Sequence, residues 1–127
     1  MVIFLYPIIE SIDLNNKNEF NKKEDYIVNN KKYIDENGDY FIGQWLNGLR
    51  HGKGTLYYKN GNIKYEGEFI KDKYEGSGKY FFENGECYIG QWLNDLKHGK
   101  GILYYKNGNI KYEGDFIKDK AEGKGKY

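Results

Sequence analysis

Two histidines, His51 and His98, are the side chains in this sequence best suited to acid–base or metal chemistry. They lie 47 residues apart in matching surroundings, His-Gly-Lys-Gly in both cases. If the segment between them forms four strands of one sheet, they lie ~19 Å apart, whereas two ligands of one zinc ion must each lie ~2 Å from it. We therefore expect no shared metal, and each imidazole is expected to bond to nearby backbone or to contact a partner.

Covalent catalysis would need a hydroxyl or thiol group beside a base, and the sequence contains few such groups. The candidate nucleophiles are Ser11, Thr55, Ser77 and Cys87. Cys87 follows a turn signal at a position where the other copies of the repeat described below have ordinary strand residues. Nothing in these positions indicates a nucleophile activated by a base.

Paired carboxylates recur along the chain, at Glu66 and Glu68 and again at Glu113 and Asp115. Their i, i+2 spacing on a strand points both side chains out of one face, which is typical of a solvated surface rather than of an acid–base pair. We therefore predict that the protein is not an enzyme and needs no cofactor.

The segment from Gly48 to Thr55 contains glycines and a lysine, as phosphate-binding loops do. Such a loop needs four residues between its first glycine and Gly-Lys, then Ser or Thr at the start of a helix. Here three residues intervene, another glycine follows Lys53, and a strand is expected instead of a helix. We expect no nucleotide binding.

The composition favours thin β-structure without a strong charge bias. Of 127 residues, 17 are Gly, 14 are Tyr and one is Pro, and aromatic residues make up 18%. Twenty Lys and Arg oppose 19 Asp and Glu, so the net charge of +1 gives no overall attraction to nucleic acid. The single Cys87 cannot form an intramolecular disulfide, which favours a reducing, cytoplasmic location. No apolar run of about 18 residues is present to span a bilayer.

A repeat of 47 residues dominates the sequence after residue 38. Residues 41–80 and 88–127 are identical at 33 of 40 positions, and each unit contains a weaker half-length copy. Four copies result, near residues 41–64, 65–87, 88–111 and 112–127. Each copy carries an aromatic-x-Gly-x-aromatic pattern followed by Gly-x-Gly, and the residues expected to shape the repeats are Phe41, Gly43, Trp45, Gly52, Gly54, Tyr65, Gly67, Phe69, Gly76, Gly78, Tyr88, Gly90, Trp92, Gly99, Gly101, Tyr112, Gly114 and Phe116.

Turn signals and period-two alternation make each copy a hairpin. Asn-Gly pairs at residues 60–61, 84–85 and 107–108 lie between apolar runs and predict type I′ turns, in which both central residues need positive φ. Alternation predicts strands on either side of each turn. The expected fold is all-β, an elongated single-layer antiparallel β-meander of about four stacked hairpins, with about eight strands over ~40 Å.

Two details of the repeat need a structural explanation. The copies follow one another at steps of 24, 23 and 24 residues. The extra residue must be absorbed by the loop Asn60-Gly61-Asn62 or by a bulge, because otherwise the next strand would turn inside out. The glycines are expected to let a neighbouring Trp or Phe ring lie flat over the backbone.

The first 37 residues contain no glycine and are predicted to form an arm or linker before a repeat domain at residues 38–127. Residues 32–38 resemble residues 79–85, so a degenerate half repeat is expected from residue 29. Residues 10–31 are interpreted as a linker, and residues 1–9 could fold back as an extra strand or dock elsewhere. The sequence ends at Tyr127 inside a second strand, which predicts an open edge suited to a homodimer.

These motifs resemble the MORN-repeat family, named for membrane occupation and recognition nexus. The third copy meets the family pattern with Tyr88-x-Gly-x-Trp92 and His98-Gly-Lys-Gly, and the first copy is similar. Copies two and four depart from it, with Phe69 and Phe116 in place of Trp. The resemblance covers about 87 residues. It implies a non-catalytic sheet that scaffolds cytoskeletal or ciliary assemblies, tethers membranes, or accompanies a catalytic domain such as a lipid kinase.

Basic residues and tyrosines are the candidate contact residues of such a sheet. Four cations are expected to cluster with both histidines at one edge, where acidic phospholipid head groups could be met: Arg50, Lys53, Lys97 and Lys100. The alternative is ion pairing between neighbouring hairpins. Five tyrosines are expected to be divided between internal packing and partner recognition: Tyr57, Tyr58, Tyr80, Tyr104 and Tyr105.

The sequence therefore predicts, first, a cytoplasmic scaffold for protein–protein interaction with an unidentified protein partner and an association with cytoskeleton or membrane. The alternatives are a peripheral module that binds phosphoinositides or other acidic lipids, and an accessory repeat segment of a longer protein. No nucleic-acid partner is expected.

Overall fold

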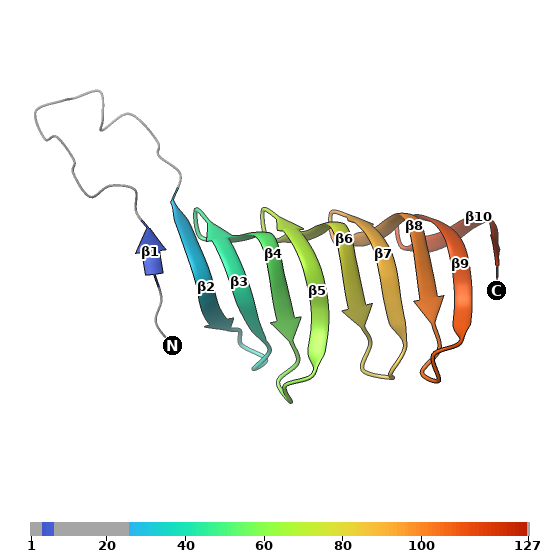
Figure 1. Cartoon of the computed structure of the whole chain (residues 1–127), viewed down its shortest axis with the longest axis horizontal. Helices are drawn as coiled ribbons and strands as arrows, with labels where there is room; N and C mark the ends of the chain where they lie inside the picture. The colour runs from blue at the N-terminus through green and yellow to red at the C-terminus, as the bar shows by residue number, and fades with distance from the viewer. Residues whose placement is uncertain (1–3, 7–25, 127) are drawn as a thin grey trace, which may run out of the picture.

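The computed structural model describes residues 4–6 and 26–126, with side chains described for residues 26–122. These residues form one ten-stranded antiparallel sheet in which the strands follow sequence order (Figure 1). The strands are β1 (Phe4–Tyr6), β2 (Ile27–Ile34), β3 (Tyr40–Leu46), β4 (Leu49–Tyr57), β5 (Ile63–Ile70), β6 (Lys73–Phe81), β7 (Cys87–Leu93), β8 (Leu96–Tyr104), β9 (Ile110–Ile117) and β10 (Lys120–Lys126). The predicted all-β, single-layer meander is confirmed.

The four copies of the repeat are the hairpins β3–β4, β5–β6, β7–β8 and β9–β10, so the expected eight strands are all present. Two further strands precede them. The linker predicted for residues 10–31 is wrong for its last five residues, because residues 27–31 belong to β2, which pairs with β3. Of residues 1–9, β1 forms an extra strand at the edge of β2. The rest of residues 1–25 and Tyr127 lie outside the described part of the chain.

The chain reverses direction with different turns at the two edges of the sheet. The sequence analysis predicted the type I′ turns at the Asn-Gly pairs, and this prediction is wrong. At Asn60-Gly61 only the glycine has positive φ, at 93°, and Gly61 N donates to Tyr58 O at 2.8 Å. This is a type I turn closed by a glycine, inside a five-residue loop. Both residues have positive φ in the two-residue turns that join the strands within each hairpin, which are 47–48, 71–72, 94–95 and 118–119. We call that side the turn edge, and the side of loops 35–39, 58–62, 82–86 and 105–109 the loop edge.

A bulge absorbs the extra residue of the longer repeats. Leu56 pairs with Tyr65 and Tyr57 with Ile63, so Lys64 has no partner in the ladder of β4 and β5. Lys111 has the same position between β8 and β9. In the shorter step the pairing of β6 with β7 is continuous. Each strand therefore keeps its rings on the same side of the sheet.

The core is a line of rings on one side of the sheet, which we call the aromatic face. Neighbouring rings meet edge to face, as for Phe41 and Phe69 with centroids 5.0 Å apart. Trp92 Nε1 donates to Gly78 O at 3.2 Å, which satisfies the indole inside the core. The buried side chains are Val28, Phe41, Trp45, Leu56, Tyr65, Phe69, Tyr88, Trp92, Tyr112 and Phe116. Packing among the rings thus closes this face without a second layer.

Glycine columns let the first ring of each copy lie flat on the sheet. A Cβ on Gly43 would lie 2.5 Å from Phe41 Cζ, and one on Gly101 would lie 2.6 Å from Tyr88 Cζ. The covering ring is therefore the first aromatic residue of the motif. It is a Phe in the first copy, as expected, but Tyr65 and Tyr88 in the next two, where the expectation of a Trp or Phe ring is wrong. These glycines also face one another across the ladder, as Gly43 with Gly54 and Gly90 with Gly101.

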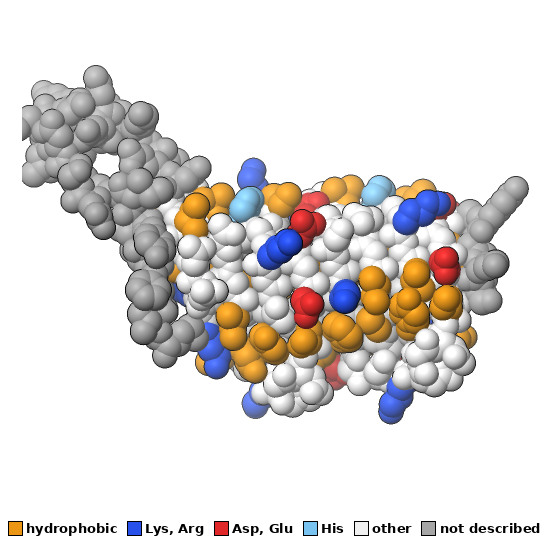
Figure 2. Space-filling model, in the orientation of Figure 1, with side chains coloured by type: hydrophobic (Ala, Val, Ile, Leu, Met, Phe, Trp, Pro, Cys, Tyr) orange, Lys and Arg blue, Asp and Glu red, His pale blue; other side chains and the backbone are white. Residues whose placement is uncertain are grey.

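The opposite side of the sheet, here the second face, carries two separate bands of apolar side chains. Alternation places on it the residues that flank the buried rings in each strand. Figure 2, in which the pale-blue histidines are visible, shows this face with hydrophobic side chains along the turn edge and a broader band towards the loop edge. Charged side chains lie between the two bands (Figure 2).

Candidate interaction surface

The second face offers two apolar rows, which we name by the edge that each lies near. The loop-side row begins with Tyr40 and Tyr57, whose rings stack with centroids 4.8 Å apart. It continues along the registered pairs of successive strands, and its members are Tyr40, Tyr57, Ile63, Phe81, Cys87, Tyr104 and Ile110. Cys87 is half-buried there, and burial raises the pKa of its thiol. Tyr57 and Tyr104, both expected contact residues, thus occupy matching places in one row.

The turn-side row consists of the residues that flank the two-residue turns. Each turn is closed by one registered pair, and the pairs are Leu46 with Leu49, Ile70 with Lys73, Leu93 with Leu96, and Ile117 with Lys120. Five of these aliphatic residues are exposed: Leu49, Ile70, Leu93, Leu96 and Ile117. The sequence analysis did not identify this row, although its signal is visible as an aliphatic residue before the turn in every copy and a second one after the turn in the first and third copies.

At the loop edge the loops are joined in pairs by the bulged lysines. Lys64 Nζ lies 3.3 Å from Asp39 Oδ2, and Lys111 Nζ lies 2.8 Å from Glu86 Oε2. The hydrogen bond with Lys111 is the main cause that lowers the pKa of the Glu86 carboxyl group. Each lysine follows one loop and reaches back to a carboxylate of the preceding loop. The ion pairs thus fasten loop 35–39 to loop 58–62, and loop 82–86 to loop 105–109.

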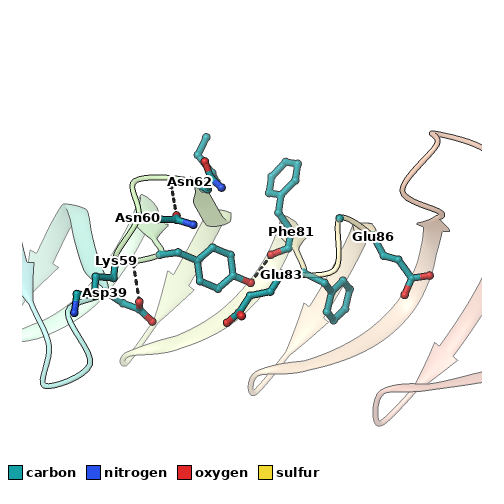
Figure 3. A pocket seen from close by; sticks show the side chains of 11 residues that line it. Asp39, Lys59, Asn60, Asn62, Phe81, Glu83 and Glu86 are labelled. Carbon is teal, nitrogen blue, oxygen red and sulfur yellow. Dashed lines mark hydrogen bonds between the residues drawn. The ribbon is translucent and has the colours of Figure 1, made fainter.

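Between the two fastened pairs lies an open notch with a volume of about 910 Å³, lined by residues of loops 58–62 and 82–86 (Figure 3). Tyr58 Oη donates to Phe81 O across it. Burial, followed by the neighbouring Tyr80, raises the pKa of Tyr58 well above its usual value. Three carboxylates line the notch. Those of Asp39 and Glu86 are ion-paired, whereas that of Glu83 is exposed. The notch is polar at its rim and has no cluster of groups suited to catalysis among the residues described.

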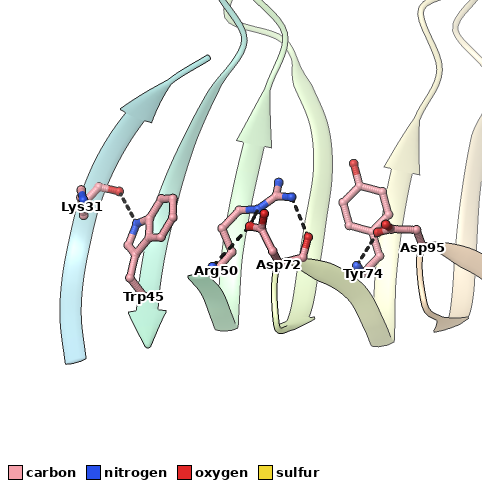
Figure 4. Close-up of polar contacts among 6 residues, drawn as sticks. All are labelled: Lys31, Trp45, Arg50, Asp72, Tyr74 and Asp95. Atoms are coloured by element: carbon pink, nitrogen blue, oxygen red, sulfur yellow. Dashed lines mark hydrogen bonds and ion pairs between the residues drawn. The ribbon is translucent and has the colours of Figure 1, made fainter. Parts of the chain in front are cut away.

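The turn edge is clasped to the preceding hairpin by acidic or amide side chains (Figure 4). Asp95 Oδ1 accepts from Tyr74 N at 2.8 Å, and Asp95 N donates to Tyr74 O at 3.1 Å. Asp119 makes the same two bonds to Lys97, and in the first hairpin Asn47 makes them to Tyr26. These turn aspartates thus carry out a structural role that the sequence did not reveal.

The four basic residues expected at one edge do not form one surface. Arg50 lies on the aromatic face, with its guanidinium carbon 4.9 Å from the Phe69 ring centroid, and bonds to Asp72 (Figure 4). Lys97 lies over the Tyr88 ring and pairs with Asp119 at 3.6 Å. The other two, Lys53 and Lys100, alternate onto the second face, opposite Glu68 and Asp115 in the ladder.

Ion pairing accounts for three of these four cations. Lys100 Nζ lies 2.8 Å from Asp115 Oδ1, and this hydrogen bond raises the pKa of the lysine. Arg50 and Lys97 are paired with turn aspartates. Lys53 is exposed and makes no ion pair within residues 26–122. The interpretation by pairing between neighbouring hairpins therefore describes most of the observed contacts.

The histidines are half-buried on β4 and β8, with three strands between them. Within the described residues no group of three or more His, Cys, Asp and Glu side chains is placed to hold a metal ion. The same residues include no helix of the length and apolarity required to cross a bilayer.

Comparison with known proteins gives the assignment of the chain. The model of the MORN repeat matches residues 41–63, 65–87, 88–110 and 112–127, the same four hairpins seen in the sheet. The chain belongs to the MORN-repeat family. This MORN-repeat chain is also similar to MORN repeat-containing protein 3 of Xenopus laevis, with 48% identity over 42 residues. That match covers 33% of the chain and 18% of the relative. The resemblance inferred from the sequence is confirmed.

Proposed function

We propose that this MORN-repeat chain is a non-catalytic scaffold that binds a protein partner on its second face. The observation that supports the proposal is the contrast between the two faces. On the aromatic face the rings bury one another, whereas on the second face two rows of apolar side chains are in contact with solvent. Ordered apolar rows with tyrosine among them are typical of interaction surfaces, because tyrosine buries a large area at a low entropic cost.

The proposal includes a cytoplasmic location and leaves acidic phospholipids as the weaker alternative. Three of the four cations expected to bind head groups are neutralised by carboxylates of the chain, which reduces the attraction that they offer. A homodimer through the outer edge of β10, a strand that pairs with β9 alone among the described strands, remains a separate proposal.

Site-specific photo-crosslinking tests the scaffold proposal in the source cells. A benzophenone amino acid replaces Tyr104 in the loop-side row, and a matched protein carries it at Asn107, three residues away on the loop edge. We expect one or a few discrete crosslinked proteins from position 104 and none of them from position 107. Identical products from both positions, or no product from position 104, would contradict binding on the loop-side row of the second face.

Vesicle flotation distinguishes binding to a protein partner from binding to lipid. Vesicles containing phosphatidylinositol phosphates are mixed with the wild-type protein at low and moderate salt. We expect the protein to stay in the soluble fraction, because three of the four cations expected to bind head groups are paired with carboxylates of the chain. Salt-sensitive flotation that Lys53→Glu abolishes would favour the lipid alternative.

A further inference from the structure

The turn-side row is a regular ladder in which aliphatic pairs alternate with aliphatic–lysine pairs. In order along the sheet it reads Leu-Leu, Ile-Lys, Leu-Leu, Ile-Lys, with one pair per hairpin. Its exposed aliphatic residues are each between 37% and 50% exposed, far above the ring residues of the other face. The ladder therefore presents a straight apolar stripe that crosses the strands, rather than scattered surface leucines.

Four lysines accompany the stripe, two within the ladder and two in the adjoining turns: Lys71, Lys73, Lys118 and Lys120. All four are exposed, and none makes an ion pair with another described residue. The aspartates of the same two turns are already ion-paired, Asp72 with Arg50 and Asp119 with Lys97. The stripe thus has unmatched positive charge at two places.

The spacing of those two places fits a helix. Lys73 lies on β6 and Lys120 on β10, four strands apart, which corresponds to ~19 Å across the sheet. A helix rises 1.5 Å per residue and turns once every 3.6 residues, so carboxylates about 14 residues apart, ~21 Å along one side of a helix, would meet both lysine pairs. The aliphatic members span β3 to β9, six strand spacings or ~29 Å, which matches a helix of about 19 residues.

We propose that the turn-side row docks an amphipathic helix of a protein partner, which lies across the strands with its apolar side on the Leu and Ile residues and with acidic residues about 14 positions apart on Lys73 and Lys120. A helix packed on a sheet is the usual way to cover an apolar sheet face. The inference rests on the proposed function, because it gives the chemistry of one partner of the same face. It concerns the turn-side row, whereas the crosslinking above reports on the loop-side row.

The chemistry of the turns favours a helix over an anionic membrane. Asp72 and Asp119 lie at the turns themselves, with side chains 47% and 46% exposed, so a flat anionic surface that approaches the edge would meet these carboxylates. A helix that lies on the second face, inside the edge, contacts the lysines of the ladder without meeting the aspartates face on.

The test uses two synthetic 21-residue helical peptides and the whole chain. Both peptides carry Leu and Ile on one side, and they differ only in having Glu or Lys at two positions 14 residues apart, which lie along that same side. Fluorescence anisotropy measures their affinity for the wild-type protein. We expect the Glu peptide to bind at least tenfold more tightly than the Lys peptide. Equal affinities, or no measurable binding of the Glu peptide, would overturn the proposal without the need for any variant.

Charge reversal then locates the site. The double variant Lys73→Glu with Lys120→Glu is expected to lower the affinity for the Glu peptide at least tenfold and to raise the affinity for the Lys peptide. The matched control is Lys59→Glu with Lys106→Glu, two exposed lysines with the same spacing on the loop edge, and it is expected to leave both affinities unchanged. An equal loss in both double variants would contradict docking on the turn-side row.

Two further measurements complete the experiment. Circular dichroism and a thermal melt of each double variant verify that the sheet is intact. Sedimentation with phosphatidylserine vesicles provides the competing outcome, because vesicle binding that requires Lys73 and Lys120, together with no peptide binding, would replace the helix by a membrane surface. Loss of the peptide interaction alone, with crosslinks from position 104 preserved, would refute this inference and leave the scaffold proposal standing.

Discussion

Lys64 Nζ lies 3.3 Å from Asp39 Oδ2, and through this ion pair the one residue that has no partner in its ladder holds two neighbouring loops together. The 24-residue repeats use the extra position for a lysine at both places where it occurs. The 23-residue step, which has no bulge, leaves the notch between loops 58–62 and 82–86 unfastened. The difference in repeat length is therefore a structural feature of the loop edge.

Deletion of Lys64 should be tolerated. Without it, Ile63 would precede Tyr65 directly and the hairpin would acquire the continuous pairing seen between β6 and β7, with every ring still on the aromatic face. The loss should be limited to the ion pair, about 1 kcal/mol or less. Urea unfolding measures it. Deletion of Glu66 is the matched control, because it reverses the faces of one side of the strand and should abolish cooperative unfolding.

Alanine at Gly101 should be destabilising although its backbone is extended. The added Cβ would overlap the Tyr88 ring, and such overpacking costs about 1–3 kcal/mol. Ser77→Ala, at an exposed position beside another glycine of the column, should change the free energy of unfolding by less than about 0.5 kcal/mol. Equal stability of the two variants would show that the ring does not lie on the glycine column.

Asp95→Ala should cost more than Asp95→Asn. Alanine leaves Tyr74 N without its 2.8 Å acceptor, and the loss of such a bond costs about 1 kcal/mol. Asparagine keeps an Oδ1 acceptor, and the first hairpin already uses Asn47 for the same bond to Tyr26 N. Thermal melts of both variants provide the measurement. Destabilisation of the same size in both would mean that the charge of Asp95, rather than the hydrogen bond, holds the turn.

The Arg50–Asp72 pair should couple more strongly than the Lys100–Asp115 pair. Arg50 bonds to both the carboxylate and the carbonyl oxygen of Asp72, the latter at 2.7 Å, and it lies over two buried rings. Lys100 is 82% exposed, so solvent screens its pair and the coupling should be small. Double-mutant cycles to alanine measure both coupling energies. A larger coupling at Lys100 would contradict this ranking.

The free energy of unfolding should decrease as the pH rises above 10. Burial raises the pKa of Tyr65 and Tyr74 well above the ordinary value of 10, and that of Tyr88 to about 12. Between pH 10 and about 12 the unfolded chain loses these phenol protons while the folded chain keeps them, so the unfolded state is favoured as pH rises. Below pH 10 this contribution to stability is fully present. Denaturant midpoints from pH 8 to 12 measure the fall, which Tyr74→Phe should make shallower.

The repeat made most of the fold predictable from the sequence, but the type of each turn could not be predicted. Asn-Gly at 47–48 and at 60–61 is the same dipeptide with different backbone geometry. Leu46 pairs with Leu49, which leaves two residues for the first turn, whereas Tyr57 pairs with Ile63, which leaves five for the second. Strand register, which depends on packing of distant rings, therefore decides the turn, and the dipeptide alone does not contain that information.

The surface was less predictable than the core for a related reason. Arg50 and Lys53 were expected in a turn, but β4 begins at Leu49, so their side chains alternate between the faces. The turn aspartates bond to the preceding hairpin, and a single copy of the motif does not reveal that contact. The rings and glycines, by contrast, act within one copy, and their spacing alone indicates where they pack.

Strand order that follows the chain has a mechanical consequence. Tension applied between β2 and β10 acts across the strands, so hydrogen-bonded ladders are loaded one after another rather than together. The ribbon should therefore yield hairpin by hairpin at a low and nearly constant force, and it should recoil by the same steps when released. Such a ribbon would work as an extensible tether, in which each hairpin stores and returns a fixed length of chain.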